Sequence, residues 1–237
     1  MQLFHIEADK IHVKWNNIEL FSVPELFSQL RKVLRIKKWD RICVQFSDNK
    51  WTTRYELSIQ DWTDKDLTGE ILSSKTFSFS KKNVSMLIAM PNKREKAEII
   101  VQKLAEIWVQ NIYFRVSDHS IIRQWNEKKA KRLDKISHEA VEQSRWTQIP
   151  EIKFLTENDL KDFVSWKNVI IANMNWLPYW KLTKSEGNDL CGVIWPEGWL
   201  SKKDLILFKN ANVIDLWVNV LRMETASIVL ARLLKNM

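Results

Sequence analysis

A short apolar run that breaks into a loop and then a helix start occurs twice near the end of this chain. Residues 190–194 form an apolar run typical of a buried strand; the loop 195–199 follows, and residues 201–204 read S-K-K-D, a helix-capping pattern. Residues 213–216 repeat this order, with an irregular turn before a helix that opens at Glu224. Open α/β sheets bind ligands at the carboxyl ends of their strands. The two loops therefore predict a binding crevice.

Strand and helix patterns alternate from residue 84 onward, which predicts a mostly parallel sheet and an α/β fold. We expect strands at 84–90, 111–116, 168–172, 190–194 and 212–216, and helices at 94–108, 126–144, 201–209 and 224–234. The Ser-, Thr- and Lys-rich residues 68–83 are expected to form a junction. The last helix is apolar on most sides, which indicates that a partner subunit covers it.

The first 72 residues have a different pattern. Short alternating segments at 10–14, 40–46 and 51–59 predict a small β-barrel or sandwich, interrupted by a helix over 24–33. We therefore expect two domains, residues 1–72 and 73–237.

Charge and composition narrow the classes of function. The net charge of +8 and a pI near 9.4 favour a polyanionic partner, although a merely basic surface would give the same numbers. Cys43 and Cys191 lie far apart in apolar runs, typical of free thiols in a reducing compartment, and no signal peptide or membrane span is expected, so we predict a cytoplasmic protein. The four histidines are scattered and no C-x-x-C occurs, so no metal site is predicted.

Several motifs, in order along the chain, carry a resemblance to one family. They are V-L-R-I-K-K-W-D at 33–40, Q-K-L-A-E-I-W-V at 102–109, E-A-V-E-Q-S at 139–144, P-E-I at 150–152, W-P-E-G-W at 195–199 and L-W-V-N-V-L-R-M-E-T-A at 216–226. With these the chain resembles the RsmE family of 16S rRNA methyltransferases in the SPOUT superfamily.

The resemblance implies an N-terminal PUA-like, RNA-binding β-barrel domain and a C-terminal SPOUT-type α/β domain with a trefoil knot. It implies a homodimer that uses S-adenosylmethionine to methylate N3 of one uridine in 16S (small-subunit) rRNA. The alternatives are another SPOUT enzyme acting on tRNA or a different rRNA position, and a non-catalytic RNA-binding or ribosome-assembly protein.

The implied site residues fall into three groups. The cofactor-binding residues are Ala172, Ile194, Trp195, Pro196, Glu197, Gly198, Leu216, Trp217, Val220, Leu221 and Thr225. Arg222, Glu224 and Glu197 are the catalytic candidates: N3 of uracil must lose a proton, which needs a base or a group that stabilises the anion. Glu224 is equally explained as a carboxylate of the first helical turn. Arg31, Arg35, Lys37 and Lys38 are candidates for RNA binding, or form a solvated basic surface.

Six positions depart from the family pattern in the same way. Tryptophan stands where the family has glycine, at Trp39, Trp51, Trp108, Trp195, Trp199 and Trp217, and the chain has 13 Trp but only 4 Gly. Each indole adds a large side chain where backbone is expected to approach a ligand closely. We hypothesise that UGA codons, read as glycine in the source, are written here as tryptophan; the alternative is true divergence.

Overall fold

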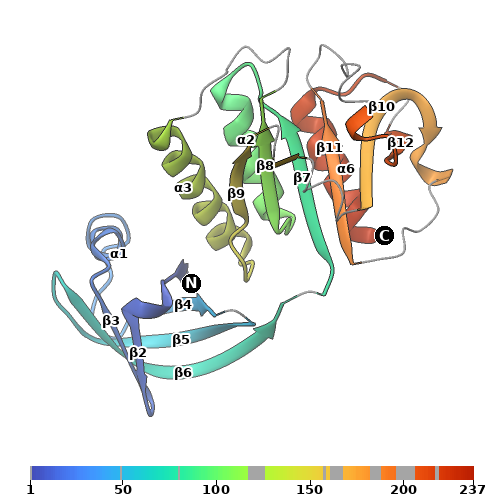
Figure 1. Ribbon diagram of the computed structural model, residues 1–237. Helices are drawn as coiled ribbons and strands as arrows, with labels where there is room; N and C mark the ends of the chain where they lie inside the picture. Colours follow the sequence, from blue (N-terminus) through green and yellow to red (C-terminus); the bar gives the residue numbers. More distant parts are fainter. Residues whose placement is uncertain are drawn as a thin grey trace. The chain divides into compact units, whose positions relative to one another are not determined.

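The chain folds into two compact units (Figure 1). The computed structural model describes residues 2–48, 50–79, 81–116, 126–156, 159–160, 168–181, 188–195, 206–216 and 219–237, except for the side chains of residues 175, 176 and 181. The first unit is Met1–Phe79 with Val141–Gln148, and the second is Ser80–Ala140 with Ile149–Met237. The expected boundary at residue 72 falls inside a strand.

The first unit is built on a six-stranded sheet with the order β1-β4-β5-β6-β3-β2. Its strands are β1 (Leu3–His5), β2 (Ile11–Lys14), β3 (Asn17–Phe21), β4 (Arg41–Ser47), β5 (Trp51–Trp62) and β6 (Asp66–Ser78). Helical turns η1 (Ala8–Lys10), α1 (Pro24–Ser28) and η2 (Gln29–Val33) interrupt it. Residues from both sheet and helix, such as Ile18, Leu30 and Leu57, form its core.

The expectation of a junction at residues 68–83 is wrong. β6 continues to Ser78 and pairs with β5 as far as Trp51, and β7 begins at Asn83. Residues 72–76 of β6 are all exposed. A strand with polar residues on both faces shows no apolar alternation, so only its backbone pairing with β5 reveals it.

Residues 141–148 belong to the first unit through a set of polar contacts. Buried Gln45 donates from Nε2 to the carbonyl of Trp146 at 2.7 Å and accepts at Oε1 from Arg54 Nη2 at 2.8 Å. Buried Thr52 donates to the carbonyl of Thr147 at 2.7 Å, and Arg54 donates to that of Arg145 at 2.8 Å. These bonds join the main chain of residues 145–147 to side chains of β4 and β5.

The second unit is a six-stranded parallel sheet with the order β12-β10-β11-β7-β8-β9. Its strands are β7 (Asn83–Ala89), β8 (Asn111–Arg115), β9 (Glu151–Leu155), β10 (Asn168–Pro178), β11 (Asp189–Ile194) and β12 (Asn212–Asp215). The helices described in full are α2 (Arg94–Glu106), α3 (Glu127–Ser144) and α6 (Met223–Asn236), and the turn η3 (Tyr179–Lys181) follows β10. The predicted α/β class is confirmed; β9 was not expected.

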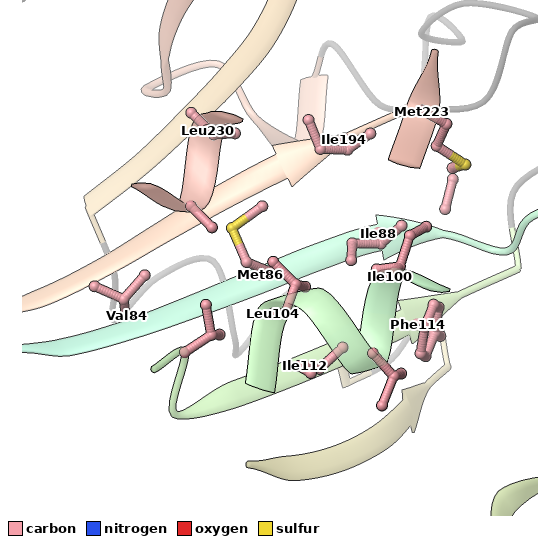
Figure 2. Close-up of a cluster of buried hydrophobic side chains, with 14 of the residues drawn as sticks. Val84, Met86, Ile88, Ile100, Leu104, Ile112, Phe114, Ile194, Met223 and Leu230 are labelled. Atoms are coloured by element: carbon pink, nitrogen blue, oxygen red, sulfur yellow. The ribbon is translucent and has the colours of Figure 1, made fainter. Parts of the chain in front are cut away.

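Two apolar layers cover the sheet, one on each face, because neighbouring residues of a strand point to opposite sides. Met86 and Ile88 of β7 lie in the layer that α2 and α6 cover, as Figure 2 shows around Leu104 and Leu230, and Leu133 of α3 belongs to the same layer. Leu87 points into the other layer, which contains Phe208.

Two expectations fall on residues outside the described ranges. The helix expected at 201–209 is described only from residue 206. Residues 196–205 and 217–218, whose path would define a trefoil knot, are also outside, so the knot stays a prediction. Within the described residues, no helix combines the length and apolar character needed to cross a membrane.

Candidate functional site

The site predicted from the sequence lies where β11 and β12 end on either side of β10, which continues and curves away (Figure 1). Ile171 pairs with Val193 of β11, and Ala172 pairs with Ile214 of β12. The pairing of β10 with β12 is interrupted after Ala172 and resumes at Leu177. β11 and β12 therefore end beside the irregular part of β10, at the kind of sheet edge where open α/β proteins bind ligands.

Most of the described cofactor candidates belong to the main apolar core on one face of the sheet. Ile194 and Leu216 are buried in it, and Ala172, Trp195 and Leu221 pack against it. Val220 does not join them, since its side chain is 76% exposed. Thr225 is exposed in α6. The predicted residues Pro196, Glu197, Gly198 and Trp217 lie outside the described ranges.

The N-terminus of α6 brings two catalytic candidates to the segment after β12. Arg222 is the N-cap residue, extended and exposed, and Glu224 lies in the first turn. Glu224 Oε2 is buried and has no hydrogen-bond partner among the described residues. The positive end of the helix dipole favours negative charge at this position. Arg222 and Glu224 therefore place a cation and a carboxylate at the start of one helix.

Sequence reasoning missed Arg115, the last residue of β8. Its side chain is only 6% exposed, and its guanidinium carbon lies 5.0 Å from the centre of the Trp195 ring, a cation–π distance. The edge of that indole meets Phe208, with ring centres 5.4 Å apart. The sequence signal that could have identified Arg115 is a charged residue at the end of an otherwise apolar strand.

The four RNA-binding candidates lie in the first unit, in and after η2, and all are exposed. Arg31 is engaged by Asp64, with Nη1 and Oδ1 2.7 Å apart, and lies over the Trp62 ring. Lys38 lies over the ring of Trp39 at 5.5 Å. Arg35, Lys37 and Lys38 form no ion pair with any other described residue.

Over the described ranges, no three His, Cys, Asp or Glu side chains gather in a way that would hold a metal ion.

The fold defines an α/β protein whose parallel sheet has apolar residues at the carboxyl ends of β11 and β12. The family model described as an RNA methyltransferase domain matches residues 79–235, so the chain belongs to the RNA methyltransferase family, and the resemblance to RsmE is confirmed. The match begins one residue before the second unit. A search of curated protein sequences finds no match.

Solved structures share the fold over the whole chain. The small-subunit rRNA methyltransferase E of Neisseria gonorrhoeae, bound to S-adenosylmethionine, superposes with a TM-score of 0.79 at 16% identity and covers 100% of this chain and 97% of its own. A methyltransferase of Legionella pneumophila in complex with the same cofactor gives 0.76 at 23% identity, covering 100% and 98%. A probable rRNA methyltransferase of Porphyromonas gingivalis gives 0.77 at 21% identity, also covering 100% and 98%.

Proposed function

We propose that this protein transfers a methyl group from S-adenosylmethionine to N3 of one uridine in 16S rRNA, in the cytoplasm and as a homodimer. Family membership supports the reaction class, and the full-length match to a small-subunit rRNA methyltransferase supports the substrate. The single observation that carries the proposal is the position of Ile194, the last residue of β11, and Leu216, directly after β12, on either side of β10 in the parallel sheet.

The residues at this edge suit an adenosyl group. Partly buried Ala172 and Leu221 offer apolar surface for the faces of a purine, above a core that contains Ile194 and Leu216. The ends of β11 and β12 offer main-chain donors and acceptors for its edge, and no special side chain is needed for that. When bound, the cofactor supplies an electrophilic methyl group on a sulfonium.

The chain must handle the proton on N3. We assign the base to Glu224, because its partly buried carboxylate lies two residues from Arg222 and its Oε2 has no hydrogen-bond partner among the described residues. Arg222 is the N-cap residue of the same helix, and we assign it as the cation that stabilises negative charge on the uracil. Glu197 stays a second candidate for the base. The target uridine must leave its stack to reach either group.

The test is transfer of labelled methyl to isolated 16S rRNA, to small subunits and to tRNA, with the product mapped to one nucleotide. We expect label at N3 of a single uridine. Glu224→Gln and Arg222→Gln should each lower kcat by about 10²-fold or more. Arg232→Gln, an exposed change on the same helix, is the matched control and should leave kcat unchanged. Label on tRNA alone would favour the alternative SPOUT enzyme.

A non-catalytic RNA-binding protein is the second candidate, and Trp195 favours it. This indole lies at the end of β11, where the proposal needs room for the cofactor. Binding of RNA with no binding of S-adenosylmethionine, measured on the same folded sample, would select this candidate.

Exposed apolar side chains near β10 and β12 support a homodimer through the second unit. Ile206 is 73% exposed and Val220 76% exposed, and Leu177 and Trp180 are also exposed. Contiguous exposed apolar patches mark interaction sites, and we propose that these four side chains belong to one. Val220→Lys should yield a monomer by light scattering, whereas Val33→Lys, a change at an equally exposed valine of the first unit, should not.

A further inference from the structure

We propose that the functional protein carries glycine at positions 15, 39 and 108, where tryptophan stands in this sequence. If the same codon is read in the same way at position 195, glycine stands there too. The inference for position 195 rests on the proposed function, whereas the inferences for positions 15, 39 and 108 rest on backbone geometry alone. Position 15 lies outside every family motif quoted above, so its geometry is independent of the resemblance.

The backbone puts these tryptophans where side chains rarely go. Six non-glycine residues of the described chain have positive φ, and three of them are tryptophans: Trp15 at 53°, Trp39 at 76° and Trp108 at 73°. Glycine adopts such angles freely, because it lacks the Cβ that clashes there, whereas for a bulky residue they are genuine outliers. A residue type that supplies 13 of 237 positions would not be expected to fill half of this set.

Trp15 lies at the first central position of a two-residue hairpin. β2 and β3 pair as far as Lys14 with Asn17, which leaves Trp15 and Asn16 in the loop. φ is positive at Trp15 and not at Asn16, the pattern of a type II′ turn, in which glycine is preferred at that position. The indole is 99% exposed, so no burial offsets its strain.

Trp39 lies at the third position of a turn that joins Lys37 to Asp40. The Asp40 amide donates to the carbonyl of Lys37 at 3.2 Å, and φ is positive at Trp39 and not at Lys38. These are the marks of a type II turn, which requires positive φ at its third residue and selects glycine there.

Trp108 lies just after α2, in the position that most often ends a helix with glycine. The Trp108 amide donates to the carbonyl of Ala105 at 3.2 Å, and the Val109 amide donates to that of Leu104 at 3.1 Å. With Ile107 as C-cap, this pair of bonds is the Schellman motif. Val109 and Leu104 are both buried, which completes its apolar contact. Three different turn types thus each place tryptophan where glycine is favoured.

The same codon rule applied to Trp195 changes the candidate site. The indole is wedged between Arg115 and Phe208 at the end of β11, and its Nε1 is buried without an acceptor among the described residues. Glycine at 195 would remove this ring from the edge of the sheet and leave main chain for the cofactor to approach. Position 195 therefore decides whether the site can hold S-adenosylmethionine.

Peptide mass spectrometry of the protein purified from its own cells tests the proposal directly. We expect glycine at positions 15, 39, 108 and 195, with UGA at the matching codons. Tryptophan in those peptides, or UGG in the gene, overturns the proposal.

Recombinant variants test the geometry without any assay of function. Trp15→Gly, Trp39→Gly and Trp108→Gly should each raise Tm by about 2–4 °C. Alanine at the same positions removes the indole but keeps Cβ, so it should give no rise. Lys14→Gly, next to Trp15 but inside β2, should lower Tm. Equal effects of glycine and alanine at all three positions contradict the proposal.

Cofactor binding tests the step at position 195. With glycine at 15, 39 and 108 in both proteins, Trp195→Gly should bind S-adenosylmethionine at least about tenfold more tightly by calorimetry than the chain with Trp195. If the glycines are found by mass spectrometry but no binding follows, the glycine positions stand and the proposed cofactor site is wrong.

Discussion

Gly192 of β11 faces Met86 of β7 across a parallel pair, and a Cβ on Gly192 would lie 2.7 Å from the Met86 sulfur. The same Cβ would lie 2.9 Å from side-chain carbons of Leu230 and Leu234 in α6. The missing side chain at 192 therefore lets α6 pack against the centre of the sheet, and so fixes the helix whose N-terminus carries Arg222 and Glu224.

Gly192→Ala should destabilise the second unit by about 1–3 kcal/mol, because a packed core has no room for an added methyl group. Urea unfolding followed by far-UV circular dichroism measures this loss. Gly69→Ala is the control, since its nearest neighbours would be at 3.3 Å and its loss should be smaller. In Met86→Ala/Gly192→Ala the two losses should not add, because the first change makes space for the second. Simple additivity would contradict the packing argument.

Glu98 should make the stability depend on acid pH. Arg132 and Arg94 both donate to its Oε1 at 2.6 Å and lower the pKa of the carboxyl to about 2. A carboxyl with a lowered folded-state pKa stabilises the fold above its unfolded pKa, near 4.3, and this contribution disappears as the pH falls toward 2. Glu98→Gln should therefore cost about 1 kcal/mol at pH 7 and nearly nothing at pH 2.

Unfolding in urea across this pH range measures the effect. Glu127→Gln, which removes an exposed ion pair with Lys131, is the matched control and should change little at any pH. A Glu98→Gln loss that is the same at pH 7 and pH 2 would rule out a charge effect.

Gln45 should hold residues 141–148 in the first unit. Gln45→Leu keeps the approximate size of the side chain but removes the partner of the Trp146 carbonyl and of Arg54. Leaving buried polar groups without partners should cost about 1–3 kcal/mol. The increase in amide hydrogen exchange should be larger over residues 141–148 than over β2, which lies at the far edge of the sheet that contains Gln45. Unchanged exchange in that segment would show that other contacts hold it.

The sequence predicted the elements whose patterns are local. Residues 190–194 and 224–234 have the apolar runs of a buried strand and helix, and β11 and α6 lie there. It failed for β6, because exposed Ser and Thr carry no periodic signal. It also failed for residues 141–148, because their main-chain carbonyls accept hydrogen bonds from side chains about 100 positions earlier. Arg115 was missed for a similar reason: only the sheet order brings the end of β8 within reach of Trp195. The strain at Trp15 is also invisible without backbone angles.

The basic residues after η2 should bind RNA phosphate in unequal degrees. Arg31 is paired with Asp64 and stacked on Trp62, so using it for phosphate would cost those interactions. Lys37 and Lys38 are exposed and form no ion pair within the described part of the chain. Lys37→Gln/Lys38→Gln should weaken binding to 16S rRNA fragments of any sequence. It should also reduce the slope of log Kd against log salt by about 1 for each phosphate that a lysine no longer neutralises.

Fluorescence titration at several salt concentrations measures that slope. Arg31→Gln should change the slope less than the double lysine variant does. Lys14→Gln, an exposed change on β2, should leave the slope unaltered. An equal reduction from all of these variants would mean that the net charge of the first unit, rather than a local surface, attracts the RNA. In that case the ion pair of Arg31 with Asp64 would no longer explain a difference between neighbouring cations, and the assignment of a phosphate site to Lys37 and Lys38 would be wrong.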